Sequence, residues 1–177
     1  REHAQHLCEY LRALSDKDIN ELKAASDSAI HTMGVTFRVY HQEEGSIDRA
    51  WPFDIVPRLI NAKEWSGIEK GLKQRIKALN MFIDDLYNDQ NIIKDGVFPA
   101  SMLKKSKNFL EECRGFSPAN GVWANICGSD LVRDNQGKVY VLEDNLRVPS
   151  GVSYMLENRQ VMKRVFPEMF QKYNILP

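Results

Sequence analysis

The sequence predicts an α+β fold in which helices dominate and a β-hairpin lies near residue 135. Apolar side chains recur at helical spacing for six turns after Asn61, which with Glu64 has the pattern of a helix start. The apolar positions are Trp65, Ile68, Leu72, Ile76, Leu79, Ile83 and Leu86. Extended apolar runs at 121–133 and 139–142 flank an Asp-Asn-Gln-Gly turn. We therefore expect a long central core helix, with Leu79 deeply buried, followed by the hairpin.

The first third of the chain is expected to contain two helices and a strand. Residues 2–14 carry one apolar stripe, and Ser15 with Asp18 forms a capping-box pattern for a second helix. Apolar and polar residues alternate over 35–40, as in a half-buried strand. Residues 41–50 are predicted to be a polar connector. We expect residues 1–33 to form an N-terminal helical segment, and residues 34–177 to form one compact unit.

Three further segments complete the outline. Two prolines in 51–58 exclude a central strand and favour an edge strand or an extended loop. Pro99 begins a broken helical region that ends near Glu112. The last helix follows a Pro-Ser-Gly turn, and Ser153 is the expected N-terminal cap.

Composition excludes several classes of function. The 177 residues carry 24 Lys+Arg and 24 Asp+Glu, so no broad basic field is available for nucleic acid. No apolar run approaches the roughly 20 residues that a membrane span needs. Cys8, Cys113 and Cys127 are odd in number and widely spaced, which argues against a disulfide framework and indicates a cytoplasmic location. The chain begins at Arg1 within a helical pattern, and we expect it to be a fragment of a longer protein.

The second hairpin strand ends in residues that suit a metal ion. Side chains alternate along a strand, so Glu143 and Asn145 share a face and Asp144 lies on the other. Carboxylate and amide oxygens are hard ligands that suit Mg²⁺, which also retains water and phosphate oxygens. If Arg133 lies opposite Lys138, Asp130 lies opposite Val141 and joins this face.

The inclusion of Asp130 in this set depends on the register of the hairpin, because a slip of one residue moves Asp130 to the other face. A solvated hairpin with polar ends is the alternative that spacing alone leaves open. An EF-hand is excluded, because aligning Gly137 with the loop glycine places Val132 at the first ligand position.

Four segments together resemble the circularly permuted ATP-grasp proteins of type 2, which are related to glutathionylspermidine synthase. These segments are GVTFRVYHQEEG (34–45), WPFDIVPRLI (51–60), GLKQRIKALNMFIDDLYNDQNIIKDGVFP (71–99) and YVLEDNLRVPSGVSYMLENRQVMKRVFPE (140–168). The resemblance covers about residues 30–170 and is densest in the last third. It implies a helix-rich N-terminal portion of the permuted ATP-grasp fold, with the C-terminal half missing and the metal-site residues on the hairpin.

The resemblance also implies an activity and the roles of several residues. Such enzymes use ATP to activate a carboxylate as an acyl phosphate, which an amine then attacks. The resemblance implies Asp130, Glu143 and Asn145 as Mg²⁺ ligands. Arg147, Ser150 and the Gly151 backbone correspond by position to groups that contact the acyl-acceptor substrate. Arg147 is suited to clamp a carboxylate or a phosphate, and Ser150 and the Gly151 N–H are suited to face the developing anion.

The expected substrates are a carboxylate and an amine, each a small molecule or a peptide, with neither nucleic acid nor membrane as a partner. The chain has no glycine-rich phosphate loop, neither GxxxxGK[ST] nor GxGxxG. We therefore expect elements outside this chain to hold most of the ATP, and this portion alone to be inactive. The alternatives are a binding module of the same fold without catalysis, and a structural domain of a larger assembly.

Overall fold

The computed structural model describes residues 4–41 and 45–175. Their contacts divide the chain into two compact units. Unit 1 combines residues 1–61 with 150–177, and unit 2 comprises residues 62–149. This division differs from the boundary expected at 33/34, because the N-terminal helices pack against the last part of the chain. Both units contain helices and a two-stranded antiparallel sheet.

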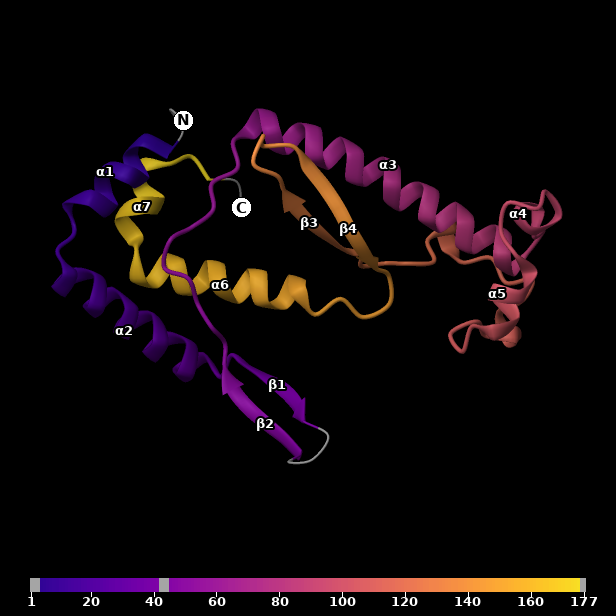
Figure 1. Cartoon of the computed structure of the whole chain (residues 1–177), viewed down its shortest axis with the longest axis horizontal. Coiled ribbons are helices and arrows are strands. Elements are labelled where there is room, and N and C mark those ends of the chain that lie inside the picture. Colours follow the sequence, from indigo (N-terminus) through magenta and orange to yellow (C-terminus); the bar gives the residue numbers. More distant parts are fainter. Residues whose placement is uncertain (1–3, 42–44, 176–177) are drawn as a thin grey trace. The chain divides into compact units, whose positions relative to one another are not determined.

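Unit 1 brings the two ends of the sequence together. Its helices and strands are α1 (Gln5–Ala13), α2 (Asp16–Met33), β1 (Thr36–His41), β2 (Gly45–Ala50), α6 (Gly151–Val165) and α7 (Pro167–Lys172). Figure 1 shows α6 and α7, from the end of the chain, beside α1 and α2, from its start. The strand expected at 35–40 is present as β1, but the polar connector expected over 41–50 is wrong for residues 45–50, which pair with β1 as strand β2.

The core of unit 1 explains why these helices associate. Leu7 of α1 packs with Met162, Phe166 and Met169, and Phe166 is completely buried. A second cluster joins Ile30 and Val35 to Val161 of α6. The Tyr154 hydroxyl also donates a hydrogen bond of 3.0 Å to the Thr36 carbonyl. Helix α6 therefore contributes to both clusters.

The sequence signal at the start of α2 is confirmed. The Ser15 N–H donates to the Asp18 carboxylate at 2.8 Å, and the Asp18 N–H donates to the Ser15 hydroxyl at 3.2 Å. This reciprocal capping box satisfies N–H groups that have no partner within the helix. Gly34 ends the helix with φ 68°, a left-handed conformation that favours glycine. Helix α6 differs from its prediction, because its N-cap is Ser150 rather than Ser153.

Unit 2 is organised along one long helix. Its elements are α3 (Ala62–Tyr87), α4 (Asn91–Lys94), α5 (Ala100–Lys105), the 3₁₀ turns η2 (Glu111–Cys113) and η3 (Ala119–Gly121), β3 (Gly128–Arg133) and β4 (Val139–Asn145). Among the described helices, none is both long enough and apolar enough to cross a bilayer.

Helix α3 has the predicted length but not the predicted burial. Leu86 is 9% exposed, Leu79 is only half-buried, and Trp65 at the other end is 39% exposed. The expectation of a central core helix is therefore wrong for this structure. The reason is the thin layer that α3 packs against, which is a two-stranded hairpin near its first half and a loop region near its last turns.

An aromatic stack attaches this loop region to the end of α3. Tyr87 lies between Phe109 and Trp123, with ring centroids 4.6 and 4.7 Å away and nearly parallel planes. The Tyr87 hydroxyl accepts a hydrogen bond of 3.1 Å from the Leu110 N–H. Asn80 accepts from the Trp123 N–H at 2.7 Å and from the Ala124 N–H at 2.9 Å. The stack and these hydrogen bonds fix residues 109–124 to α3.

The Asp85 carboxylate holds the short helix α4. It accepts the Asn91 N–H at 2.9 Å and the Ile92 N–H at 3.0 Å. Hydrogen bonds from Ile92 and Asn91 lower the pKa of Asp85 below its ordinary value. Because the pKa is lower in the folded state, Asp85 stabilises the fold above its unfolded pKa, and this stability is lost as the pH falls through the folded pKa.

We predict that Asp85→Asn lowers the denaturation midpoint at pH 7, because the amide cannot accept both N–H groups as a carboxylate does. The difference from the parent should shrink as the pH falls below about 4, where aspartate becomes protonated. Urea denaturation followed by circular dichroism from pH 7 to pH 3 measures this. The control is Asp89→Asn, at an exposed position in the same part of the chain. A difference that does not depend on pH would contradict the assigned role of the charge.

Gly128, at the start of β3, allows a close backbone approach. A Cβ atom built there would lie only 2.6 Å from the Pro149 Cβ, so a larger residue requires a shift of this segment. Gly71 in α3 has no neighbouring atom within 4 Å of such a Cβ. The two glycines therefore allow the same substitution to be tested in opposite environments.

We predict that Gly128→Ala destabilises the protein by about 1–3 kcal/mol, as overpacking does. Gly71→Ala should instead stabilise it by about 0.5–1 kcal/mol, because glycine is unfavourable inside a helix. The free energy of unfolding from urea titration measures both changes. If Gly128→Ala left that free energy unchanged, the close contact with Pro149 would be disproved.

Candidate functional site

The site residues predicted from the sequence lie on and after the β3–β4 hairpin. Its turn is held by Asp134, whose carboxylate accepts the Gln136 N–H at 3.0 Å and the Lys138 N–H at 2.8 Å. Gly137 has φ 87°, which glycine adopts without strain. The tight turn expected from the Asp-Asn-Gln-Gly sequence is therefore confirmed.

The predicted register of the hairpin is wrong by one residue at the turn. Arg133 pairs with Val139 rather than with Lys138. A bulge then shifts the pairing once more, because Leu131 pairs with Val141 whereas Asp130 pairs with Glu143. The two shifts together leave Asp130 on the face of Glu143. The structure therefore places the two acidic residues directly opposite each other.

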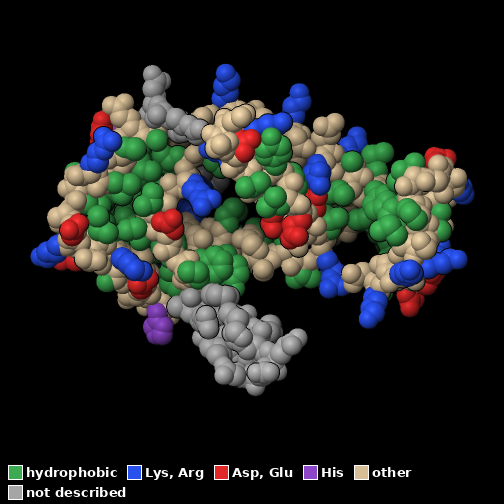
Figure 2. All heavy atoms as spheres, viewed as in Figure 1, with side chains coloured by type: hydrophobic (Ala, Val, Ile, Leu, Met, Phe, Trp, Pro, Cys, Tyr) green, Lys and Arg blue, Asp and Glu red, His purple; other side chains and the backbone are tan. Residues whose placement is uncertain are grey.

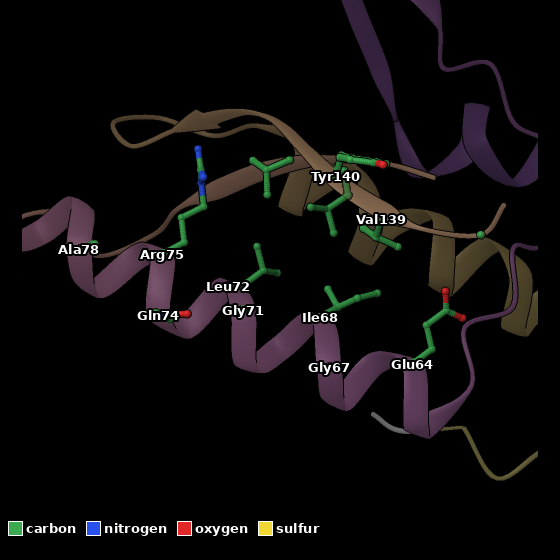
Figure 3. A pocket seen from close by; sticks show the side chains of 13 residues that line it. Glu64, Gly67, Ile68, Gly71, Leu72, Gln74, Arg75, Ala78, Val139 and Tyr140 are labelled. Carbon is green, nitrogen blue, oxygen red and sulfur yellow. The ribbon is translucent and has the colours of Figure 1, made fainter. Parts of the chain in front are cut away.

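The other face of the hairpin packs against α3. Asp144 is only 8% exposed at its side chain, and it accepts a hydrogen bond of 2.7 Å from Arg75 Nε and one of 2.8 Å from the Ser129 hydroxyl. Arg133 forms a second ion pair with Glu64 of α3. Figure 3 shows Arg75, Leu72 and Ile68 on the side of α3 that faces the hairpin. These ion pairs determine which face of the hairpin is covered.

An open groove of about 740 Å³ lies between α3 and the hairpin. Its walls include Ile68 and Leu72 of α3 and Leu131, Val139 and Val141 of the strands. Cys127 lies directly before β3, and burial, with a smaller effect of the Asp144 charge, raises the pKa of its thiol. Cys127 is therefore less ionised than an ordinary thiol, which does not favour a nucleophilic role.

The exposed face carries the predicted metal ligands. Asp130, Glu143 and Asn145 are all exposed, and Asn145 Nδ2 donates a hydrogen bond of 3.1 Å to Glu143 Oε1. In the described part of the chain, no group of three or more His, Cys, Asp or Glu side chains is arranged to hold a metal. The set on this face comprises two carboxylates and a carboxamide. Its oxygen donors fit Mg²⁺, which commonly takes one or two protein carboxylates and keeps several waters.

The remaining predicted residues follow β4. Arg147, in unit 2, is exposed, and its Nη1 donates a hydrogen bond of 3.1 Å to Asn108 Oδ1. Ser150 and Gly151 belong to unit 1, as the N-cap and the first residue of α6. Ser150 is exposed, and its side chain does not cap the helix.

Sequence reasoning missed Asn108 and Gly128. Asn108 lies 39 residues before Arg147, in a stretch without a motif. Gly128 is isolated within an apolar run, a pattern that can indicate a bulge or a close backbone approach. That signal was available in the sequence, whereas nothing in the sequence connects Asn108 with Arg147.

Comparisons with known proteins agree with the resemblance seen in the sequence. The chain is 50% identical over its full length to an uncharacterized protein of Synechocystis sp., of which it spans 37%. It is 45% identical over 165 residues to an uncharacterized protein of Mycobacterium tuberculosis, of which it spans 29%. It is 34% identical over 166 residues to a Frankia casuarinae protein provisionally named glutamate–cysteine ligase 2-2, of which it spans 19%.

The family match covers the whole of unit 2 and the part of unit 1 that contains α6 and α7. Residues 57–177 match the family described as circularly permuted ATP-grasp type 2. The hairpin, Arg147, Ser150 and Gly151 all fall within the matched residues. The chain belongs to the circularly permuted ATP-grasp type 2 family.

Proposed function

We propose that this chain is part of an ATP-dependent carboxylate–amine ligase. The observation that carries the proposal is the exposed hairpin face on which Asp130 lies opposite Glu143, with Asn145 hydrogen-bonded to Glu143. Membership in the ATP-grasp family supports ATP as the cosubstrate. Two Frankia relatives with provisional names of glutamate–cysteine ligases support the reaction class.

The hairpin face would hold the metal ion. The carboxylates of Asp130 and Glu143 and the carboxamide oxygen of Asn145 are the proposed ligands. Asn145 uses its amide nitrogen in the contact with Glu143, so this contact leaves its oxygen available. A bound Mg²⁺ neutralises phosphate charge and positions the transferred group, which is most of what phosphoryl transfer requires.

The proposed reaction has two steps. A carboxylate oxygen of the first substrate forms a bond to the γ-phosphorus of ATP while the bond to the β–γ bridging oxygen breaks, and ADP leaves. The amine of the second substrate then attacks the acyl carbon. The bond from that carbon to the phosphate oxygen breaks, inorganic phosphate leaves, and the amine loses a proton to give the amide.

Residues after the hairpin would act on the acyl group and the acceptor. The Ser150 hydroxyl and the Gly151 N–H are proposed to donate hydrogen bonds to the oxygen that becomes negative when the amine attacks. Arg147 is proposed to bind a carboxylate of the acceptor substrate through its guanidinium. The chain spans only part of its relatives, so the complete reaction is proposed for the full-length protein, with elements outside this chain holding most of the ATP.

We predict that Glu143→Gln in the full-length protein lowers Mg²⁺-dependent ADP release by about 10² or more, as removal of a main electrostatic stabiliser does. The substitution keeps the size of the side chain and removes the charge that holds the metal. Release of ADP is measured with a panel of carboxylates and amines that starts with glutamate and cysteine. Because Glu143 is exposed, the thermal midpoint should stay within error of the parent.

Glu168→Gln is the matched control, because Glu168 is exposed on α7 and is not among the proposed site residues. Its ADP release should equal that of the parent. Equal activity of Glu143→Gln and the parent would remove the ligase mechanism. If no substrate pair supports ADP release by the parent, the alternative of a non-catalytic module that binds a peptide or another partner is favoured.

A further inference from the structure

The Arg147 guanidinium forms no ion pair with a carboxylate in the part of the chain that the structure describes. Within residues 4–41 and 45–175, Asn108 is its one hydrogen-bonding partner. The side chain is exposed. A guanidinium has five N–H donors in a planar fork, and the hydrogen bond to Asn108 uses one of them. The other donors suit the two oxygens of a carboxylate.

Asn108 is attached to a rigid support. It directly precedes Phe109, whose ring stacks on Tyr87 of α3 at 4.6 Å between centroids. On the other side of Phe109, the Leu110 N–H donates to the Tyr87 hydroxyl at 3.1 Å. The Asn108 backbone is therefore fixed through its neighbours to the end of α3. The side-chain Oδ1 of Asn108 can hold Arg147 in one orientation and so reduce the entropy that the arginine loses when it binds a ligand.

The segment around Asn108 carries an excess of positive charge, because residues 104–114 contain three lysines and Arg114 but only two acidic residues, Glu111 and Glu112. Lys104, Lys105 and Lys107 come immediately before Asn108 and are exposed. Glu111 is neutralised by an ion pair with Arg114. Figure 2 shows several Lys and Arg side chains in the region of α5 on the face drawn, with acidic side chains beside them. Such a concentration of positive charge raises the local concentration of anions.

We propose that Asn108 is a positioning residue that orients Arg147 to bind the carboxylate of an anionic substrate, and that the lysine segment 104–107 attracts this substrate. The proposal rests on the proposed function, because it identifies the acceptor as a carboxylate-bearing amino acid or peptide. A guanidinium binds the oxygens of a carboxylate or of a phosphate in the same bidentate way. The carboxylate is therefore assigned from the proposed ligase reaction, and inorganic phosphate is the competing ligand in the test.

Calorimetric titration of the full-length protein with L-cysteine, the amine in the substrate panel above, tests this proposal in the absence of ATP. The parent should bind L-cysteine and should not bind L-cysteine methyl ester, which lacks the carboxylate. Asn108→Ala should weaken binding about threefold to tenfold, the effect of losing one hydrogen bond. Arg147→Ala should weaken it about tenfold or more, as for hydrogen bonds to a charged group. The Asn20→Ala control, at an exposed position in α2, should bind like the parent.

The decisive variant is the double substitution Asn108→Ala with Arg147→Ala. If Asn108 acts through Arg147, the double variant should bind L-cysteine as weakly as Arg147→Ala alone. A purely structural effect of Asn108 would instead weaken binding equally in both backgrounds, and that result overturns the positioning role. Thermal unfolding of each variant shows whether the fold is retained.

Two other results would overturn the carboxylate site. One is failure of the parent to bind L-cysteine, or equal binding of the methyl ester. The other is displacement of L-cysteine by inorganic phosphate at equal concentration, which would identify a phosphate site. Neither result depends on ATP turnover, so the carboxylate site and the ligase mechanism can fail independently.

Discussion

The ion pair between Arg75 and Asp144 is the constraint on which the arrangement of the hairpin depends. A buried carboxylate is costly unless a positive group and hydrogen-bond donors accompany it, and Asp144 has Arg75 and the Ser129 hydroxyl. Asp144 therefore has to face α3. Since successive side chains of a strand alternate, its neighbours Glu143 and Asn145 have to face outward. The orientation of Glu143 and Asn145 therefore follows from Asp144, which is not itself among the proposed metal ligands.

The sequence predicts local features of this molecule well. The capping box of Ser15 with Asp18 and the turn at Asp134 depend on residues close together in the chain, and both are present. The register of the hairpin depends on pairing between strands, and the bulge beside Asp130 has no local signal strong enough to place it. Asp130 still lies on the face of Glu143, as predicted. The one-residue error in the register at the turn and the one-residue bulge cancel each other in the alternation of side chains.

Contacts between distant segments lie beyond what periodicity can predict. The apolar stripe of α3 correctly indicated a helix, but burial of Leu79 depends on what packs against it, and the hairpin covers little. The association of α1 and α2 with α6 joins segments more than a hundred residues apart, so the predicted boundary at 33/34 does not match the contacts. The hydrogen bond between Arg147 and Asn108 also joins segments that are far apart in the sequence, and no sequence pattern predicts it. Such pairs are fixed by tertiary geometry, whereas a sequence pattern reports only the local backbone.

The discontinuous composition of unit 1 has a consequence for synthesis on the ribosome. Its core requires Leu7, Ile30 and Val35 from the start of the chain, but also Val161 and Phe166, which are translated more than a hundred residues later. Until then, α1 and α2 have no α6 to cover their apolar sides, whereas all the residues of unit 2 precede residue 150. Closing a chain segment of this length costs conformational entropy. Nascent α1 and α2 are therefore the parts of this chain most dependent on protection from aggregation during translation.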